Sequence, residues 1–281
     1  MIKIPGSETF TKIEPIHKGW TNDKKYYIET SDGRKLLLRI ADVSEYEHKK
    51  AQFSLLKWVS KLDIPMSHPM DLGLCNYGEN VYQIFNWVDG EAVDSVLPKI
   101  SKTKQYHLGL NAGRLLQMIH SIPVTANTED WGIQFNHMLQ DELETHHSQP
   151  EMHSDFGETI KEYFKKNRDI LGVRSQVYMH GDYNPGNLII TPNGELGVID
   201  FSSSYGDPYW DIFKVSWRPS LFPYYYSGQI RGYFNNEPTL DFWNVYTHYF
   251  AYGVLIALRS PQWAGFNNPE EGKSVVQNII A

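Results

Sequence analysis

Residues Met179–Asp211 read MHGDYNPGNLIITPNGELGVIDFSSSYGDPYWD, and this alternation of polar and apolar residues predicts a definite local structure. Two short apolar runs, Leu188–Ile190 and Leu196–Ile199, flank the turn sequence Pro-Asn-Gly. Such a pattern is typical of two strands joined by a tight hairpin. The hairpin reverses the chain, so Asn187 before the first strand and Asp200 after the second are expected to come close together.

Three polar side chains of this stretch suit phosphoryl transfer. That reaction needs charge neutralisation on the phosphates, a metal ion that bridges them, and a carboxylate that orients the attacking hydroxyl. Asn187 and Asp200 offer the hard oxygen ligands that Mg²⁺ takes. Asp182, on the loop before Asn187, is placed to accept the proton of an acceptor hydroxyl.

The order of these residues resembles the kinase signature, which has H-R-D, an Asn five residues after the Asp, and then D-F-G. Here Gly181 stands in place of the Arg and Ser202 in place of the last Gly. The combination of His-Gly-Asp, Asn187, Ile-Asp-Phe and Gly-Asp-Pro, with Asp211 just after, resembles the aminoglycoside phosphotransferase family. These proteins are small-molecule kinases with a protein-kinase-like fold.

The resemblance implies a two-lobe α+β fold of the protein-kinase-like type. A small antiparallel-sheet lobe would bind the nucleotide over residues 1–87. A larger, mainly helical lobe would carry the catalytic and acceptor sites over residues 88–281. The phosphoryl donor would be ATP, with GTP as an alternative, and the metal would be Mg²⁺.

The resemblance also implies a role for each residue of the motif. Asp182 would be the catalytic base, and Asn187 and Asp200 would be the Mg²⁺ ligands. His180 and Asp211 would support the catalytic loop.

The first ninety residues are predicted as an antiparallel sheet with one helix, from strand-like runs separated by turn residues. The helix is predicted from apolar residues spaced by about 3.6 positions. The expected strands are Thr9–Ile16, Lys25–Thr30, Lys35–Ile40, Leu72–Cys75 and Asn80–Phe85, and the expected helix is Tyr46–Leu62.

A nucleotide cradle is expected at the first strand pair, because backbone amides and small side chains of such a loop approach phosphates. Gly19, Thr21 and Asn22 are the candidates. Arg39, on the third strand, occupies the position where kinases place a phosphate-binding Lys, and Lys35 lies on the same face as a second choice.

The helix that follows the third strand normally supplies a Glu that pairs with this cation. Here the aligned residue is Gln52, and Glu47 lies five positions earlier, so the sequence leaves the partner of Arg39 open. The linker after the fifth strand resembles the adenine-binding segment of the family, with Phe85, Asn86 and Val88 as candidates.

Composition excludes several other classes. The chain of 281 residues carries a formal net charge of −7, which argues against nucleic acid as a partner and is compatible with a cationic small molecule. A single cysteine fits a reducing compartment. No apolar run approaches the roughly 20 residues that span a bilayer, and no signal peptide is recognisable, so no membrane association and a cytoplasmic location are expected. The oligomeric state is not predicted.

Helices are expected around Leu108–Ile119, Phe156–Phe164 and Leu240–Val254. Histidines between the first two lack a compact metal-ligand spacing and are expected to be solvated in a loop: His137, His146, His147 and His153.

The acceptor is the least determined part. An aminoglycoside-type antibiotic is the first expectation, and its several ammonium groups would need the carboxylates of Asp155, Glu158, Glu237 and Asp241. The region after Asp211 is richer in Tyr and Trp, which bind a quaternary ammonium such as choline by cation–π attraction. A metabolite kinase for choline, an amino sugar or homoserine is therefore an alternative, and a nucleotide-binding pseudokinase is another.

Overall fold

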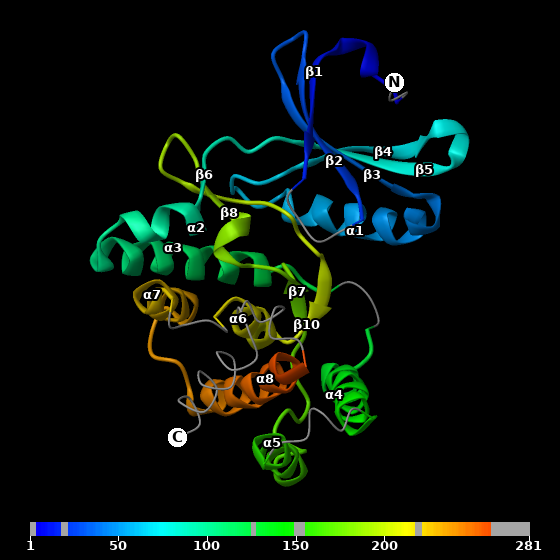
Figure 1. Cartoon of the computed structure of the whole chain (residues 1–281). Coiled ribbons are helices and arrows are strands. Elements are labelled where there is room, and N and C mark those ends of the chain that lie inside the picture. The colour runs from blue at the N-terminus through cyan, green and yellow to red at the C-terminus, as the bar shows by residue number, and fades with distance from the viewer. Residues whose placement is uncertain (1–3, 18–21, 125–127, 149–154, 217–220, 260–281) are drawn as a thin grey trace. The chain divides into compact units, whose positions relative to one another are not determined.

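The computed structural model describes residues 4–17, 22–124, 128–148, 155–216 and 221–259. The chain packs as two compact units (Figure 1). The first consists of Met1–Ile100 and His180–Ser204, and the second of Ser101–Met179 and Tyr205–Ala281. The expected boundary between the lobes, at residues 87 and 88, stays a prediction. The first unit is made of two separate stretches of the chain, because His180–Ser204 packs with the first hundred residues.

The first unit contains the antiparallel sheet that the sequence predicts, with five strands in the order β1-β2-β3-β5-β4. Strand alternation buries one face of the sheet, where Ile28, Leu38 and Ile84 lie in a common core. The strands are β1 (Phe10–Ile16), β2 (Lys24–Thr30), β3 (Lys35–Asp42), β4 (Pro69–Cys75) and β5 (Asn80–Asn86).

Helix α1 (Tyr46–Val59) lies along this sheet, against β4 and β5 (Figure 1). It buries Phe53 with its ring centroid 6.0 Å from that of Phe85 on β5. Phe85 is the register partner of Leu37 on β3, so α1 packs on the face of the sheet that also bears Arg39.

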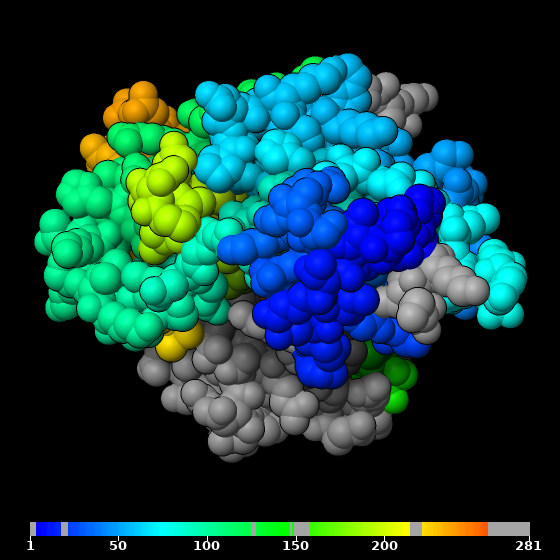
Figure 2. All heavy atoms as spheres, turned by 90° about the horizontal axis from the view of Figure 1, so that it is seen from above, coloured from blue at the N-terminus to red at the C-terminus, as the bar shows by residue number. Residues whose placement is uncertain are grey.

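A smaller sheet in the same unit contains the predicted hairpin. Its strand order is β6-β8-β9, with β6 (Glu91–Ala92), β8 (Leu188–Ile190) and β9 (Leu196–Val198). The tip of the hairpin is exposed and forms the yellow-green patch in Figure 2. A short helix, α2 (Val93–Val96), follows β6.

The second unit is mainly helical. Its aromatic core joins several helices around Phe135, Trp210 and Tyr249, and the Trp131 indole N–H donates to the Tyr249 hydroxyl at 2.7 Å. The elements are α3 (Lys102–His120), α4 (Trp131–Ser148), α5 (Asp155–Lys166), β7 (Val177–Met179), β10 (Ser204–Gly206), α6 (Pro208–Ser216), α7 (Pro223–Phe234) and α8 (Leu240–Arg259).

Three of the four histidines that were expected in a loop, His137, His146 and His147, lie on helix α4. The expectation of a loop is therefore wrong for these three. His137 is exposed on the helix, whereas His146 is buried and its Nε2 lies 2.7 Å from the Leu255 carbonyl oxygen. His153 lies outside the described residues. Within the described part of the chain, no group of three or more His, Cys, Asp or Glu side chains could hold a metal ion.

A search of the described helices finds none with the length and apolar content needed to cross a bilayer.

Helices α3 and α7 cross at two matched pairs of glycines. Gly109 and Gly113 on α3 face the backbone of α7, and Gly228 and Gly232 on α7 face the backbone of α3. A Cβ at any of these positions would overlap a backbone carbonyl oxygen of the other helix. The close approach therefore depends on the missing side chains, as in other small-residue helix crossings.

Gly113→Ala should lower the free energy of unfolding by at least about 1–3 kcal/mol, the usual cost of overpacking a core. The added methyl would overlap the Gln229 carbonyl oxygen, and backbone cannot move aside as a flexible side chain does. Urea unfolding measures the change. Asn111→Ala, on the exposed side of the same helix, is the control and should leave stability near that of the parent; equal stability of the two variants would refute the close crossing.

Candidate active site

His180 fixes the loop that carries Asp182. The imidazole is fully buried; its Nδ1 accepts from the Asp182 backbone N–H at 3.1 Å, and its Nε2 lies 3.0 Å from the Ile199 carbonyl oxygen. The ring also packs 4.4 Å from the ring of Phe201. One side chain thereby connects the loop before the hairpin to the residues directly after it.

The backbone explains why glycine follows this histidine. Gly181 has a φ of +83°, and a Cβ there would lie 2.8 Å from the Ser202 Cβ. The arginine of the protein-kinase signature would meet both obstacles. Asp200 also has a positive φ, 58°, a conformation that Asp adopts more readily than most residues.

The Asp182 carboxylate is held by two side-chain amides. Asn184 donates to its Oδ1 at 2.9 Å, and Asn187 donates to its Oδ2 at 2.8 Å and to its backbone carbonyl at 2.9 Å. The side-chain nitrogen of Asn187 therefore faces Asp182. The side-chain oxygen of Asn187 lies on the other side of the amide group, where it is available as a ligand for a cation.

Asn187 and Asp200 come together as the hairpin predicts. The backbone N–H of Ile199, the residue before Asp200, donates to the backbone carbonyl oxygen of Asn187 at 3.0 Å. The amide oxygen of Asn187 and the carboxylate of Asp200 are both oxygen donors of the kind that Mg²⁺ takes, with water and phosphate oxygens as its usual further ligands.

Arg39 answers the question that the sequence left open, because its partner is neither Glu47 nor Gln52. The guanidinium donates to Asp23 through Nε at 2.9 Å and Nη2 at 2.8 Å, and through Nη1 to Asp200 Oδ1 at 2.8 Å. Glu47 is 81% exposed, and Gln52 donates to the Ser202 carbonyl oxygen at 2.8 Å.

Two lysines complete this buried cluster. Lys49, on α1, donates to Asp23 Oδ2 at 2.6 Å, and Lys25, on β2, has its Nζ 3.5 Å from Asp200 Oδ2. The side chains of Lys25, Lys49 and Asp23 are only 7–10% exposed. Lys35, the second choice for the phosphate cation, instead pairs with Asp89 at 2.9 Å on the surface.

The cations shift the titration of both carboxyls. Burial alone would raise the pKa of Asp23, but the hydrogen bond from Lys49 and the charge of Arg39 outweigh it and bring the pKa below its ordinary value. The pKa of Asp200 is lowered in the same way, since Arg39 and Lys25 outweigh its burial. Both groups are therefore carboxylates at neutral pH.

Of the three candidates for the nucleotide-binding loop, the structure describes only Asn22. Gly19 and Thr21 lie outside the described residues. Asn22 lines a polar depression with Lys24 and Ile40, which point to the opposite face of their strands from Lys25 and Arg39.

The linker candidates lie at the end of β5. Phe85 is buried under α1, and Asn86 accepts from the backbone N–H of His68 through its side-chain oxygen. Val88 approaches the hairpin strand β9, where its Cγ1 would lie 2.9 Å from a Cβ placed on Gly197.

Asp211 is in the second unit and is fully buried. Its Oδ2 lies 3.2 Å from Nε2 of His120, whose Nδ1 is 2.9 Å from the Tyr233 hydroxyl. Asp211 thus joins α6 to the end of α3 and to α7.

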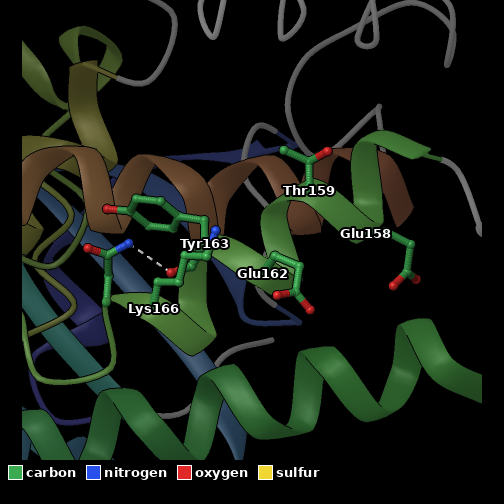
Figure 3. A pocket seen from close by; sticks show the side chains of 6 residues that line it. Glu158, Thr159, Glu162, Tyr163 and Lys166 are labelled. Carbon is green, nitrogen blue, oxygen red and sulfur yellow. Dashed lines mark hydrogen bonds between the residues drawn. The ribbon is translucent and has the colours of Figure 1, made fainter.

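Three of the four carboxylates expected to serve an acceptor are paired with cations of their own unit, and the side chain of Asp155 lies outside the described part of the structure. Glu237 binds Arg231, Asp241 lies 3.1 Å from Arg174, and Glu158 lies 2.7 Å from Lys161. Glu158 also borders a shallow pocket on α5, with Thr159, Glu162, Tyr163, Lys166 and Asn167 (Figure 3). None of the candidate catalytic residues lines that pocket.

Sequence reasoning did not identify Asp23, Lys25, Lys49 or Asn184. Asn184 had a signal, since Asn before Pro185 is a favoured capping residue, and it accepts from the Gly186 N–H at 2.8 Å. Lys25 also had one, because strand alternation places it on the face of Tyr27 and Glu29, away from buried Ile28.

Several solved structures of similar fold come from kinases or phosphotransferases. A choline/ethanolamine kinase family protein from Mesorhizobium loti aligns with a TM-score of 0.64 and 15% identity, over 91% of this chain and 79% of that one. The streptomycin–ATP–APH(2")-IIa ternary complex aligns with a TM-score of 0.63 and 15% identity, over 100% and 97%.

A third solved structure, amicoumacin kinase hAmiN in complex with AMP-PNP, Ca²⁺ and Ami, aligns with a TM-score of 0.60 and 15% identity, over 96% and 89%. At these identities the likeness establishes the fold, and it confirms the predicted two-lobe, protein-kinase-like α+β class. A sequence comparison with curated proteins gives no match.

The family is established by sequence. Residues 12–243 match the model of the phosphotransferase enzyme family. The chain belongs to this family, which confirms the resemblance to aminoglycoside phosphotransferases, and it is a phosphotransferase that acts on hydroxyl groups.

Asp23→Asn should lower the free energy of unfolding by about 3–5 kcal/mol at neutral pH, the range for breaking a buried ion pair. The substitution keeps the shape and removes the charge that compensates Arg39 and Lys49. Because the pKa of Asp23 is depressed in the folded state, its contribution is complete above about pH 4 and is lost as the pH falls through the folded pKa. The difference between variant and parent should therefore shrink in acid.

Urea unfolding at neutral and acidic pH measures both effects. The matched control is Asp32→Asn, which removes an exposed carboxylate paired with Arg34 at 2.8 Å; its effect should stay below about 1 kcal/mol. If the two variants were equally stable at neutral pH, Asp23 would not hold the cluster together.

Proposed function

We propose that the protein transfers the γ-phosphoryl group of a nucleoside triphosphate to a hydroxyl of a small molecule, with Asp182 as the base and Asn187 and Asp200 as Mg²⁺ ligands. The observation that carries this proposal is that two side-chain amides hydrogen-bond to the Asp182 carboxylate. Asn184 and Asn187 each bind one carboxylate oxygen, so the group is oriented before any acceptor arrives. A base of fixed direction is what in-line attack on phosphorus requires.

In this mechanism the acceptor oxygen forms a bond to the γ-phosphorus while the bond to the bridging β–γ oxygen breaks. Asp182 takes the hydroxyl proton, and His180 holds its backbone in place. Mg²⁺, when bound, would neutralise charge on the phosphates. Arg39 lies next to Asp200 and would contact the same phosphates.

The nucleotide is proposed to be ATP, with GTP as the alternative. Its base would lie along the linker, at Phe85, Asn86 and Val88, and its phosphates would meet the loop that includes Gly19, Thr21 and Asn22. The solved complexes of similar fold with ATP, AMP-PNP or GDP support a nucleotide of this size.

An aminoglycoside-type antibiotic is the first acceptor that we propose, supported by the similar complexes with streptomycin and kanamycin. A metabolite kinase is the second, and a specific observation favours it. Glu158, Glu237 and Asp241 already pair with cations of the protein, so they offer less charge to a polycationic drug.

Measuring nucleoside diphosphate release from ATP and from GTP, over aminoglycosides, choline, amino sugars and homoserine, tests these proposals. Turnover with an aminoglycoside alone selects the first acceptor, and turnover with a metabolite alone selects the second. If none of these acceptors increased the release of nucleoside diphosphate, the result would count against the proposed function.

Asp182→Asn should lower kcat by roughly 100- to 10,000-fold, the usual contribution of a general base. The amide cannot accept the hydroxyl proton. One of the two bonds from Asn184 and Asn187 is lost, because one acceptor oxygen becomes an NH2 donor, but the backbone bonds of residue 182 to His180 and Asn187 are kept. Steady-state kinetics give kcat, and thermal unfolding and nucleotide titration should match the parent. A variant with parental kcat would show that Asp182 is not the base.

Asp200→Ala should abolish the part of ATP affinity that depends on Mg²⁺. Titration of ATP with and without Mg²⁺ gives the ratio of the two dissociation constants, which should approach one in the variant. Asp89→Ala removes an exposed carboxylate paired with Lys35 and is the matched control. Parental Mg²⁺ dependence in Asp200→Ala would remove Asp200 from the metal site.

A further inference from the structure

Lys25 lies directly across the sheet from Arg39. It is the direct register partner of Arg39 across the antiparallel pair β2–β3, so both side chains leave the same face of the sheet. Both also reach the same carboxylate, Arg39 through Asp200 Oδ1 at 2.8 Å and Lys25 through Asp200 Oδ2 at 3.5 Å.

The cluster contains more positive than negative charge. Lys25, Arg39 and Lys49 bring three cations, and Asp23 and Asp200 bring two carboxylates, which leaves an excess of one positive charge. An uncompensated charge in a buried position is unfavourable. The excess therefore favours the binding of an anion at this place.

Lys25 is the cation that is held least tightly. Lys49 lies 2.6 Å from Asp23, and Arg39 makes contacts of 2.8–2.9 Å to two carboxylates. The Lys25 ammonium has one ion-pair partner among the described residues, at 3.5 Å, although its side chain is only 10% exposed. An ammonium has three donors, so most of its hydrogen-bonding capacity is available for another acceptor.

We propose that Lys25 binds phosphate oxygens of the nucleotide beside Arg39, so that the two cross-strand cations together hold the triphosphate. This inference rests on the proposed function, since it takes the nucleotide as the anion. When the phosphates engage the Lys25 ammonium, Asp200 Oδ2 becomes available to the metal. The same lysine compensates the charge of Asp200 when no nucleotide is bound.

A purely structural role for Lys25 leads to different behaviour. If it only compensates Asp200, then removing both charges together restores the balance and has no effect on phosphate affinity. If it binds phosphates, its removal weakens binding even when Asp200 is already neutral. The comparison of Asp200→Asn with the Lys25→Gln/Asp200→Asn double variant separates the two roles.

This pair of variants also protects the experiment against misfolding. The double variant has two cations and one carboxylate in the cluster, hence the same excess of one positive charge as the parent. Thermal unfolding of each variant verifies its fold. Lys24→Gln, the neighbouring residue on the opposite face of β2, is the matched control.

Calorimetric titration with ATP, ADP and adenosine, without Mg²⁺, is the test. Lys25→Gln should weaken ATP binding by roughly 10- to 150-fold, the range for a charge-assisted hydrogen bond, in both the parental and the Asp200→Asn background. Lys24→Gln should bind ATP as the parent does. Adenosine, which lacks phosphates, should bind all variants alike.

Two results would overturn the inference while leaving the proposed function intact. One is a parent that binds ATP together with a double variant that binds it as tightly as Asp200→Asn. The other is an equal loss of adenosine and ATP affinity in Lys25→Gln, which would indicate a change of fold. A parent that binds no nucleotide would overturn the proposed function and this inference together.

Discussion

The bridge from Arg39 to two carboxylates is the interaction on which the first unit depends. Arg39 comes from the middle of the sheet, Asp23 from the turn before β2, and Asp200 from the end of the hairpin. A guanidinium has donors on two edges of a rigid plane, so it can join two separate carboxylates, and a lysine at this position could not keep both in the same geometry.

The bridge also explains why the chain departs from the usual kinase arrangement. In that arrangement a helix glutamate partners the strand cation. Here the helix supplies a cation, Lys49, and the carboxylate comes from Asp23. The acid and the base have exchanged elements, and the helix residue aligned with that glutamate, Gln52, has turned to the Ser202 carbonyl oxygen. The departure at Gln52 is therefore compensated within the same cluster.

Local pattern was enough to predict the sheet, the hairpin and the catalytic loop. Alternation and turn residues define β1–β5 and β8–β9, and the spacing of Asp182, Asn187 and Asp200 in the chain is the basis of the proposed chemistry. The ion-pair partners were beyond reach because they depend on register between distant segments. Arg39 and Asp200 are 161 positions apart, and no local pattern links them. The exchange of Glu for Asp23 was invisible for the same reason.

The helical unit was harder to read than the sheet. Helix α4 was missed although its signal is present, since Trp131, Phe135 and Leu139 recur every four positions, as apolar residues do on one face of a helix. The carboxylates near the acceptor region could be identified from the sequence, but their pairing with Arg174, Arg231 and Lys161 could not.

The division of the first unit along the chain has a consequence for its synthesis. Its two pieces, Met1–Ile100 and His180–Ser204, are separated by the whole of Ser101–Met179. A nascent chain that ends before Asp200 holds Lys25, Arg39 and Lys49 with Asp23 as their only carboxylate from the completed cluster. The five-stranded sheet lies wholly in the first piece, but its charged cluster can be completed only after the hairpin has left the ribosomal exit tunnel.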